Sequence, residues 1–412
     1  MSTLKNIRIH VVDDDSITLL AVKYLLEEYK AEVKTSSSSK DALLEIIDER
    51  PDLVILDLMM PGLDGLDMCR LLRQEPGLKD LKIVIFSGKT YEHDQQRAMS
   101  FGADGYITKP LIDENFVKKI MEIIEEKVEL SYWGVRGTLP VSGEKSLRYG
   151  GNTICISIQF PKDNLMILDA GSGIKQLSDH LMSTQDSGFH AKILISHPHW
   201  DHINALPFFV PLYVQGNEFE IFGASHGDIS MRELISAQMD GVYFPIRIKE
   251  FAARTYFRDL KEEEFKINDV NVKTMLLSHP GTCLGYRFEY RDRSICYVTD
   301  NELFPEGTKE YNPNYWEKLT AFVASTDILI TDATYTDEEY TKKMKWGHSA
   351  VSQVVKLAHA AQVKELHLIH HDPDQSDDDI DQKLKTAQKL LKELKSKTKC
   401  IAPRELQSFQ VQ

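Results

Sequence analysis

The stretch Ser196-His197-Pro198-His199-Trp200-Asp201-His202 gathers three imidazoles and a carboxylate within a few positions and directly follows the apolar run Ile193-Leu194-Ile195. The apolar run predicts a buried strand, and the stretch after it predicts the loop at the end of that strand. Imidazole nitrogen and carboxylate oxygen are ligands that zinc-like divalent ions prefer. The spacing lets the first two histidines face one ion while the aspartate and the last histidine face a second. We therefore interpret the stretch as a metal-binding motif.

The chain has 412 residues, which is long enough for two ordinary domains. Its content of 42% hydrophobic and 27% charged residues is typical of a globular protein. The formal net charge of −14 disfavours a nucleic-acid polymer as a partner, because such a surface repels phosphate backbones. The cysteines form no Cys-x-x-Cys pair, no stretch has a signal-peptide pattern, and no apolar run reaches about 18 residues. We expect a cytoplasmic protein without membrane contact.

Short apolar runs alternate with helical stretches through the first 127 residues, which we interpret as one domain. The runs cover residues 7–12, 53–56, 83–86 and 105–108, and residues 17–29 show helical periodicity. That alternation predicts an α/β domain with a parallel sheet covered by helices on both faces. Such sheets bind ligands beyond the carboxyl ends of their strands. The residues at those ends are Asp13, Asp14, Asp57, Ser87 and Lys109.

These strand-end side chains suit phosphoryl chemistry. Clustered carboxylates hold Mg²⁺, which prefers oxygen ligands. A carboxylate beside the ion can act as a nucleophile on a phosphoryl group, and an ammonium and a hydroxyl can hold the transferred phosphoryl oxygens. A single strand-end aspartate is explained as a turn residue or a helix cap, but that explanation does not account for the whole set.

Residues 5 to about 125 resemble the receiver domain of two-component response regulators, with Asp57 in the motif Asp57-Leu58-Met59-Met60-Pro61-Gly62. The resemblance implies a flavodoxin-like, doubly wound five-stranded parallel sheet with Asp57 as the phosphoacceptor. Asp13 and Asp14 would form the acidic pair that binds Mg²⁺, together with Asp57 and the carbonyl of Met59.

The same resemblance implies that Ser87 and Lys109 contact the phosphoryl group and that Tyr106 occupies the rotamer-switch position. We expect a cognate sensor histidine kinase or a phosphotransfer protein as the phosphoryl donor. A homodimer through the receiver is a further expectation from the behaviour of the family. Asp15 is an additional acid, which we interpret as a helix cap rather than a ligand.

Residues 113–130 place apolar side chains at helical spacing, and no Gly-, Ser- or Pro-rich linker follows them. We predict that the last receiver helix runs straight into a second domain, residues 128–412. Such a helix either transmits a twist between the domains or acts as a plain connector, and the sequence leaves both readings open.

Residues of ligand type also stand within two positions after the apolar runs 165–168, 272–277, 295–298 and 366–369. In chain order they are Asp169, His279, Asp300 and His370. This arrangement is typical of a layered sheet protein that builds a site along one edge. Residues 377–399 predict a helix with an acidic start and a basic end, which match the helix dipole.

From about residue 132 to residue 373 the chain resembles the metallo-β-lactamase superfamily, and within it the tRNase Z-like and cyclic-nucleotide-phosphodiesterase-like branch. The resemblance rests on the His-x-His-x-Asp-His motif and on Asp169, His279, Asp300, His348 and His370. It implies an αββα sandwich that holds two divalent transition metals, zinc first, with manganese or iron as alternatives.

Carried over residue by residue, the resemblance assigns two sets of metal ligands that share a bridging carboxylate. One ion would be held by His197, His199 and His279, the other by Asp201, His202 and His370, with Asp300 between them. His370 fits the strand-end position better than His371, although either imidazole is within reach.

Three residues receive further roles from the resemblance. Asp169 would orient a ligand imidazole. His348 would contact the scissile phosphate or protonate the leaving group. Asp201 belongs to the catalytic set as well as to the ligands.

Together these features predict a response regulator of a phosphorelay whose output domain is a dinuclear metal hydrolase. The favoured reaction is phosphodiester hydrolysis on a small substrate such as a cyclic nucleotide. One alternative is another hydrolase of the same fold, acting on a thioester, a lactone or an oligoribonucleotide. The other is a phosphorylation-switched binding protein with a structural metal site.

Overall fold

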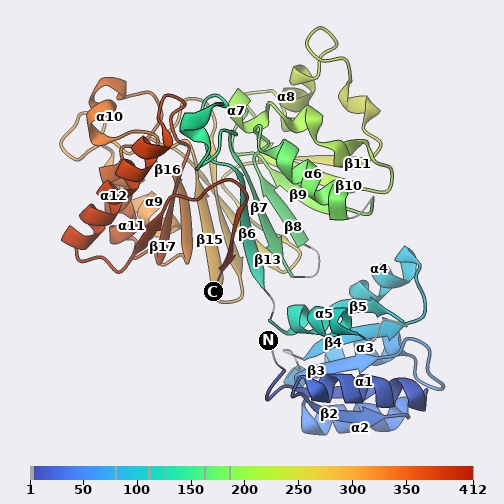
Figure 1. Cartoon of the computed structure of the whole chain (residues 1–412). Coiled ribbons are helices and arrows are strands. Elements are labelled where there is room, and N and C mark those ends of the chain that lie inside the picture. The colour runs from blue at the N-terminus through green and yellow to red at the C-terminus, as the bar shows by residue number, and fades with distance from the viewer. Residues whose placement is uncertain are drawn as a thin grey trace. The chain divides into compact units, whose positions relative to one another are not determined.

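The computed structural model describes residues 4–78, 81–109, 113–125, 127–161, 164–184 and 187–411. Along the chain it divides into two units, Met1–Lys127 and Val128–Gln412 (Figure 1). Among the described residues, no helix is both long and apolar enough to cross a membrane.

The first unit is built on a five-stranded sheet in the order β2-β1-β3-β4-β5, and every neighbouring pair is parallel. Its strands are β1 (Arg8–Val12), β2 (Glu32–Ser36), β3 (Leu53–Leu56), β4 (Lys82–Ser87) and β5 (Gly105–Thr108). Its helices are α1 (Ser16–Glu28), α2 (Ser39–Glu49), α3 (Gly65–Gln74), α4 (Glu92–Ser100) and α5 (Glu114–Glu125). The predicted doubly wound parallel sheet is confirmed.

Strand β3 shows why the central strands are apolar throughout. Leu53 and Ile55 belong to a core cluster with residues of α1 and α5, whereas Val54 and Leu56 belong to a cluster with residues of α2 and α3. Because successive side chains of a strand point to opposite faces, a sheet covered on both sides buries all of them.

The strands located from the sequence agree with the structure, whereas strand β2 was not located and the end of the unit differs from the prediction. Asp15 caps α1, and its carboxylate accepts hydrogen bonds from the backbone N–H groups of Ile17 and Thr18. The helix predicted over residues 113–130 is wrong beyond Glu125, because Val128–Gly134 forms strand β6. In β6, Val128 pairs with Val411 and Leu130 pairs with Ile158, and this sheet pairing outweighs the local helical periodicity.

The second unit contains two seven-stranded sheets. The first has the order β11-β10-β9-β8-β7-β6-β19, with β7 (Cys155–Phe160), β8 (Asn164–Leu168), β9 (His190–Leu194), β10 (Glu218–Ala224), β11 (Arg254–Leu260) and β19 (Gln407–Val411). The second runs in sequence order through β12 (Glu264–Ile267), β13 (Val270–Leu276), β14 (Leu284–Tyr290), β15 (Arg293–Val298), β16 (Ile328–Asp332), β17 (Glu365–Ile369) and β18 (Lys399–Ile401).

Helices cover the outer faces of both sheets, which confirms the predicted αββα sandwich. Figure 1 shows α6 and α8 outside the first sheet and α9, α11 and α12 outside the second. The helices of this unit are α6 (Ile174–Thr184), α7 (Trp200–Ile203), α8 (Met231–Gln238), α9 (Pro313–Phe322), α10 (Asp337–Lys343), α11 (Val351–Ala360) and α12 (Asp377–Glu393).

The main core lies between the two sheets. In β8, Met166 and Leu168 join the cluster that also contains residues of β13 to β17, whereas Leu165 and Ile167 pack with residues of α6 and α8. Each strand therefore contributes one face to the layer between the sheets and one to the layer beneath the helices.

The C-terminal helix is shorter than predicted. Helix α12 ends at Glu393, and Lys399–Ile401 forms β18, which pairs with β17. Pairing with the sheet edge determines this boundary, which the charge pattern of residues 377–399 did not reveal.

Candidate metal centre and receiver site

The loops after four strands bring the predicted ligand residues of the second unit together. They follow β9 in the first sheet and β13, β15 and β17 in the second. Three groups of potential metal ligands form among the described residues, and within each group the ligand atoms lie within 4.8 Å of one another. The first is His197, His199, His279 and Asp300, the second is Asp201, His202, Asp300 and His370, and the third is Asp332, His348 and His370. The structure thus assembles the two sets that the sequence predicts, and Asp300 belongs to both.

In the first group, the Nε2 atom of His279 lies 3.1 Å from Nδ1 of His199. The Oδ2 atom of Asp300 lies 3.6 Å from Nε2 of His197 and 3.7 Å from Nε2 of His279. These separations bring three nitrogens and one carboxylate oxygen around a single point.

In the second group, it is the other oxygen of Asp300 that takes part. Its Oδ1 atom lies 3.2 Å from Nε2 of His202 and 3.1 Å from Nε2 of His370. The Oδ2 atom of Asp201 lies 3.2 Å and 3.1 Å from the same two nitrogens. Because each oxygen of Asp300 faces a different group, this carboxylate is oriented to bridge two ions.

The buried nitrogens test whether the residues fit metal ions. The Nε2 atom of His197 is buried and makes no hydrogen bond with any described residue. A buried polar atom without a hydrogen-bond partner destabilises a protein, and a metal ion would satisfy this atom. In the second group, Nδ1 of His202 bonds to Oδ2 of Asp169 at 2.8 Å. The donor set therefore fits two divalent ions of the zinc type.

Asp169 is fully buried beneath this cluster. Its carboxylate accepts hydrogen bonds from the backbone and the hydroxyl of Ser196, at 2.7 and 2.8 Å, and from the hydroxyl of Tyr297 at 2.5 Å. With these partners it fixes the ring of His202 so that Nε2 points into the second group.

Burial and nearby charges together determine the protonation states of the ligand side chains. Burial lowers the pKa of His197, His199 and His279, so these imidazoles stay neutral and keep a free lone pair. Burial alone would raise the pKa of the Asp300 carboxyl, but the imidazoles of His370 and His202 outweigh it and hold that pKa well below the usual range. Neutral imidazole and ionised carboxylate are the forms that bind a divalent ion.

His202 behaves differently from the other imidazoles. Burial would lower its pKa, but the carboxylates of Asp201, Asp300 and Asp169 outweigh burial and raise the pKa well above the usual range. An ion that binds at His202 therefore has to displace a proton, so binding to the second group weakens as the pH falls.

His348 lies at the rim of the cluster and is held by a residue that the sequence analysis missed. Its Nδ1 atom donates to Oδ2 of Asp332 at 2.9 Å, and its ring stacks on His370 with the centroids 4.8 Å apart. Asp332 is the last residue of β16, so the rule that ligand-type residues follow apolar strands would have found it. Burial would lower the pKa of His348, but Asp332 and then Asp300 outweigh it and raise that pKa to about 9.

Glu302 is a second residue that the sequence analysis missed. Its buried carboxylate accepts hydrogen bonds from the hydroxyl of Tyr340 at 2.9 Å and from the backbone N–H groups of Lys345 and Gly347 at 2.6 and 2.8 Å. It thereby holds the loop that ends in His348. No local signal in the sequence distinguishes Glu302 from an ordinary surface glutamate.

Of the two adjacent histidines after β17, the structure brings His370 into the cluster and leaves His371 outside it. The ring of His371 is buried near Tyr149, with 6.0 Å between the centroids, and its backbone bonds to Val135 and Gly137. Its two ring nitrogens make no hydrogen bond with any described residue.

In the first unit, the strand-end side chains meet around Lys109. The Nζ atom of Lys109 lies 2.5 Å from Oδ1 of Asp57 and 2.6 Å from Oδ2 of Asp13. The other oxygen of Asp57 accepts a hydrogen bond from the backbone N–H of Met59 at 2.6 Å. Burial raises the pKa of Asp13, whereas Asp13 and Asp57 outweigh burial at Lys109 and raise the pKa of its ammonium.

The other predicted receiver residues are Asp14, Ser87 and Tyr106. In the described part of the chain, none of them makes a hydrogen bond or an ion pair with Asp57. Asp14 is exposed, and Ser87 is buried at the end of β4. The hydroxyl of Tyr106 donates to the backbone carbonyl of Lys89 at 3.0 Å. Among the described residues, the compact groups of potential metal ligands all belong to the second unit, so the acids of the first unit form no group as tight as those.

Two family models match the chain in separate regions. The model of the response regulator receiver domain matches residues 9–121, and the model of the beta-lactamase superfamily domain matches residues 166–371. The transcriptional regulatory protein PhoP of Bacillus subtilis, named for alkaline phosphatase synthesis, is 34% identical over 119 residues, which are 29% of this chain and 49% of PhoP. The chain spans about half the length of the curated relatives it matches.

Solved structures are similar to about two thirds of this chain. The metallo-beta-lactamase fold protein YhfI from Bacillus subtilis is similar with a TM-score of 0.52 and 15% identity, over 69% of this chain and 100% of that chain. The short form of human tRNase Z has a TM-score of 0.46 and 18% identity, over 69% of this chain and 99% of that chain.

The backbone beside His370 provides a test of the second ligand group. A Cβ atom at Gly137 would lie 2.1 Å from Cε1 of His370, so the substitution Gly137→Ala has to displace that imidazole. We expect Gly137→Ala protein to bind one zinc-type ion per chain and the unaltered protein to bind two, as measured by plasma mass spectrometry after zinc loading and dialysis.

The matched control is Gly88→Ala, because a Cβ atom there would meet nothing within 4 Å. It should retain two ions. Thermal melts of the metal-free proteins establish that both variants fold. Two tightly bound ions in folded Gly137→Ala protein would contradict the placement of His370 in the second group.

Proposed function

The chain belongs to the beta-lactamase superfamily and carries a response regulator receiver domain in residues 9–121, and on that basis we propose that it is a response regulator with a two-metal phosphodiesterase as its output domain. The substrate is a small phosphodiester such as a cyclic nucleotide. The observation that carries this proposal is the position of Asp300, whose two oxygens face two separate ligand groups beside His348.

Two divalent ions held by the two groups would offset charge on a phosphoryl group and make water nucleophilic at neutral pH. The residues of the chain supply the rest of the chemistry. His197, His199 and His279 hold one side of the site, Asp201, His202 and His370 hold the other, and Asp300 fixes the spacing between them. A phosphodiester that binds across this centre is held with one phosphoryl oxygen toward each group.

His348 supplies the proton that the leaving oxygen needs. Its Nδ1 atom donates to Asp332, so the transferable proton is the one on Nε2. Asp332 fixes the ring orientation and stabilises the charged imidazolium. Glu302 holds the adjoining backbone through Lys345 and Gly347, and so keeps His348 facing the cluster.

The receiver domain supplies the regulation. Asp57 accepts a phosphoryl group from a histidine kinase or a phosphotransfer protein, and Asp13, Asp14 and the carbonyl of Met59 would hold the Mg²⁺ that this transfer needs. The ammonium of Lys109 forms an ion pair with the Asp57 carboxylate, so it is placed to bind an oxygen of a phosphoryl group attached to Asp57. Ser87 and Tyr106 then respond to the phosphorylated state, and turnover by the second unit changes with it.

Substrate class is tested with a panel of bis-p-nitrophenyl phosphate, cyclic mononucleotides, cyclic dinucleotides and a thioester. Metal-loaded protein should hydrolyse at least one phosphodiester and leave the thioester intact, because the two groups are arranged for a charged phosphoryl group. His348→Ala should lower kcat by about 10²- to 10⁴-fold, the usual contribution of a general acid. Turnover of the thioester alone would contradict the proposal.

The pair of Asp332 and His348 predicts a change in the pH profile. His348 acts in its protonated form, so kcat falls as the pH rises through its pKa. Asp332→Asn removes the main group that raises this pKa, and the alkaline limb of the kcat profile should therefore move to lower pH.

The control for that experiment is Asp327→Asn, a buried carboxylate next to the opposite end of β16 that bonds to Ser294 and Lys364. The alkaline limb of the kcat profile of Asp327→Asn protein should stay at the pH of the unaltered protein, even if the variant is less stable. An unchanged limb in Asp332→Asn protein would remove His348 from the role of acid.

Control by the receiver predicts that acetyl phosphate alters turnover of the responsive phosphodiester in the unaltered protein. Asp57→Asn should abolish that response, because the phosphoacceptor is gone. Asp67→Asn, a half-exposed carboxylate on α3, should keep it. A response that persists in Asp57→Asn protein would show that acetyl phosphate acts elsewhere.

A further inference from the structure

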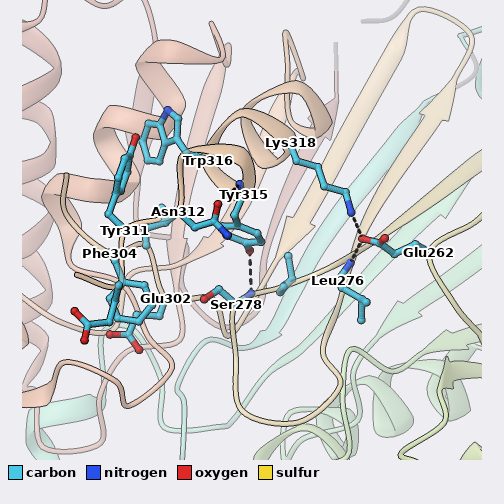
Figure 2. Close-up of a pocket in the computed structure, with 13 residues that line it drawn as sticks. Glu262, Leu276, Ser278, Glu302, Phe304, Tyr311, Asn312, Tyr315, Trp316 and Lys318 are labelled. Carbon is cyan, nitrogen blue, oxygen red and sulfur yellow. Dashed lines mark hydrogen bonds and ion pairs between the residues drawn. The ribbon is translucent and has the colours of Figure 1, made fainter. Parts of the chain in front are cut away.

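A cavity of about 390 Å³ lies on the second sheet beside the metal centre (Figure 2). It is lined by the end of β13, the segment 302–312 after β15, and the first turns of α9. This volume falls in the range of small-molecule sites, which is about 300–1,000 Å³. Of the residues that line the cavity, Glu302 has a role described above, which is to hold the loop that ends in His348.

Aromatic rings form much of its wall. They belong to Phe304, Tyr311, Tyr315 and Trp316. Figure 2 shows the rings of Tyr311 and Trp316 on the same side of the cavity, with Phe304 below them. A wall of this kind suits a flat aromatic ligand, because ring faces stack on one another.

Two glutamates of the cavity form ion pairs with lysines. Glu262 pairs with Lys318 at 2.5 Å, and Glu310 pairs with Lys345 at 2.6 Å. Only one oxygen of each of these two glutamates is engaged by the bonds that the described residues make, so the other can accept a further hydrogen bond. The free oxygens of these two carboxylates suit a ligand that donates N–H groups.

The cavity and the metal centre share a wall. The backbone N–H of Ser278 bonds to the side chain of Asn301 at 3.0 Å and to the hydroxyl of Tyr315 at 2.9 Å. The N–H of Glu302 in turn bonds to the carbonyl of Ser278 at 2.8 Å. Ser278 precedes the ligand His279, and Asn301 follows the ligand Asp300. Residues in the wall of the cavity are therefore adjacent in sequence to two ligands of the metal centre.

Resting on the proposed phosphodiesterase activity, we propose that this cavity binds the nucleobase of the substrate. A base has a flat ring for Tyr311 and Trp316 and N–H donors for Glu262 and Glu310. Ser278 lines the cavity and directly precedes the ligand His279, so a base in the cavity leaves its phosphodiester on the side of the metal centre. The substrate class is accordingly a nucleotide phosphodiester, in preference to a phosphodiester with two alkyl or glycerol groups.

The test compares two esters with the same leaving group, a nucleoside 5′-p-nitrophenyl phosphate and methyl p-nitrophenyl phosphate. Esters of adenosine, guanosine, cytidine and uridine are used. The unaltered protein should favour at least one nucleoside ester in kcat/KM. Tyr311→Ala and Trp316→Ala should each reduce that preference by about tenfold, mostly through KM, because the stacking surface is lost.

The matched control is Tyr256→Ala, an exposed tyrosine on β11 of the other sheet, which should keep the preference. Glu310→Gln provides a variant that leaves the rings in place, and it should reduce the preference for bases that donate N–H groups. Thermal melts establish that each variant folds. The proposal would be overturned if the unaltered protein had equal kcat/KM for the nucleoside esters and the methyl ester. It would also be overturned if the preference for a nucleoside ester survived both ring substitutions.

A second measurement separates this proposal from the proposed function. Equilibrium dialysis with the four free nucleosides, which carry no phosphate, measures binding without turnover. Binding that is lost in Tyr311→Ala protein supports the base site even if neither ester is hydrolysed, a result that would count against the phosphodiesterase alone. Hydrolysis of both esters at equal rates without nucleoside binding would leave the phosphodiesterase standing and exclude the base site.

Discussion

The Asp300 carboxylate is the interaction on which the site depends. Its Oδ1 atom faces His202 and His370, and its Oδ2 atom faces His197 and His279. Asp300 follows a strand of the second sheet, whereas His197 and His202 follow a strand of the first. A single buried carboxylate therefore requires the two sheets to pack in one register.

Hydrogen bonds between the sheets maintain that register close to the site. The hydroxyl of Tyr286 donates to the carbonyl of Ile195 at 2.6 Å, and the N–H of Leu284 donates to the carbonyl of Ser196 at 2.9 Å. The buried guanidinium of Arg136 donates to the carbonyls of Gly150 and Gln375 and so anchors the chain just after His370. Polar groups in a dry interior are stable only when such partners satisfy them, and this network leaves the ligand nitrogens pointing at the cluster.

Most of the fold was predictable because its central strands are covered on both faces. Apolar runs located β3, β8, β15 and β17 to within a few residues, and the ligand-type residues after them marked one edge of the sheets. Strand β2, Glu32–Ser36, was missed because only one of its residues is a large aliphatic, as suits the edge of a sheet. The end of α5 and the start of β18 depended on pairing with distant strands, which local periodicity does not record.

The site was predictable where chemistry demands particular residue types at a strand end. Asp332 obeys the same rule and was overlooked only because the resemblance did not draw attention to it. Glu302 was not predictable, since its role comes from three backbone and side-chain contacts with residues about forty positions away. The cavity beside it was also out of reach, because its aromatic side chains come from a loop and a helix that only the folded chain brings against β13.

The central claim is that Asp300 joins two ions in one centre. The most direct measurement is anomalous diffraction from crystals of the metal-loaded protein, collected on both sides of the metal absorption edge. The account predicts two peaks per chain, about 3.5–4 Å apart, with one oxygen of Asp300 toward each. A single peak, or two peaks with Asp300 bound to only one of them, would contradict it.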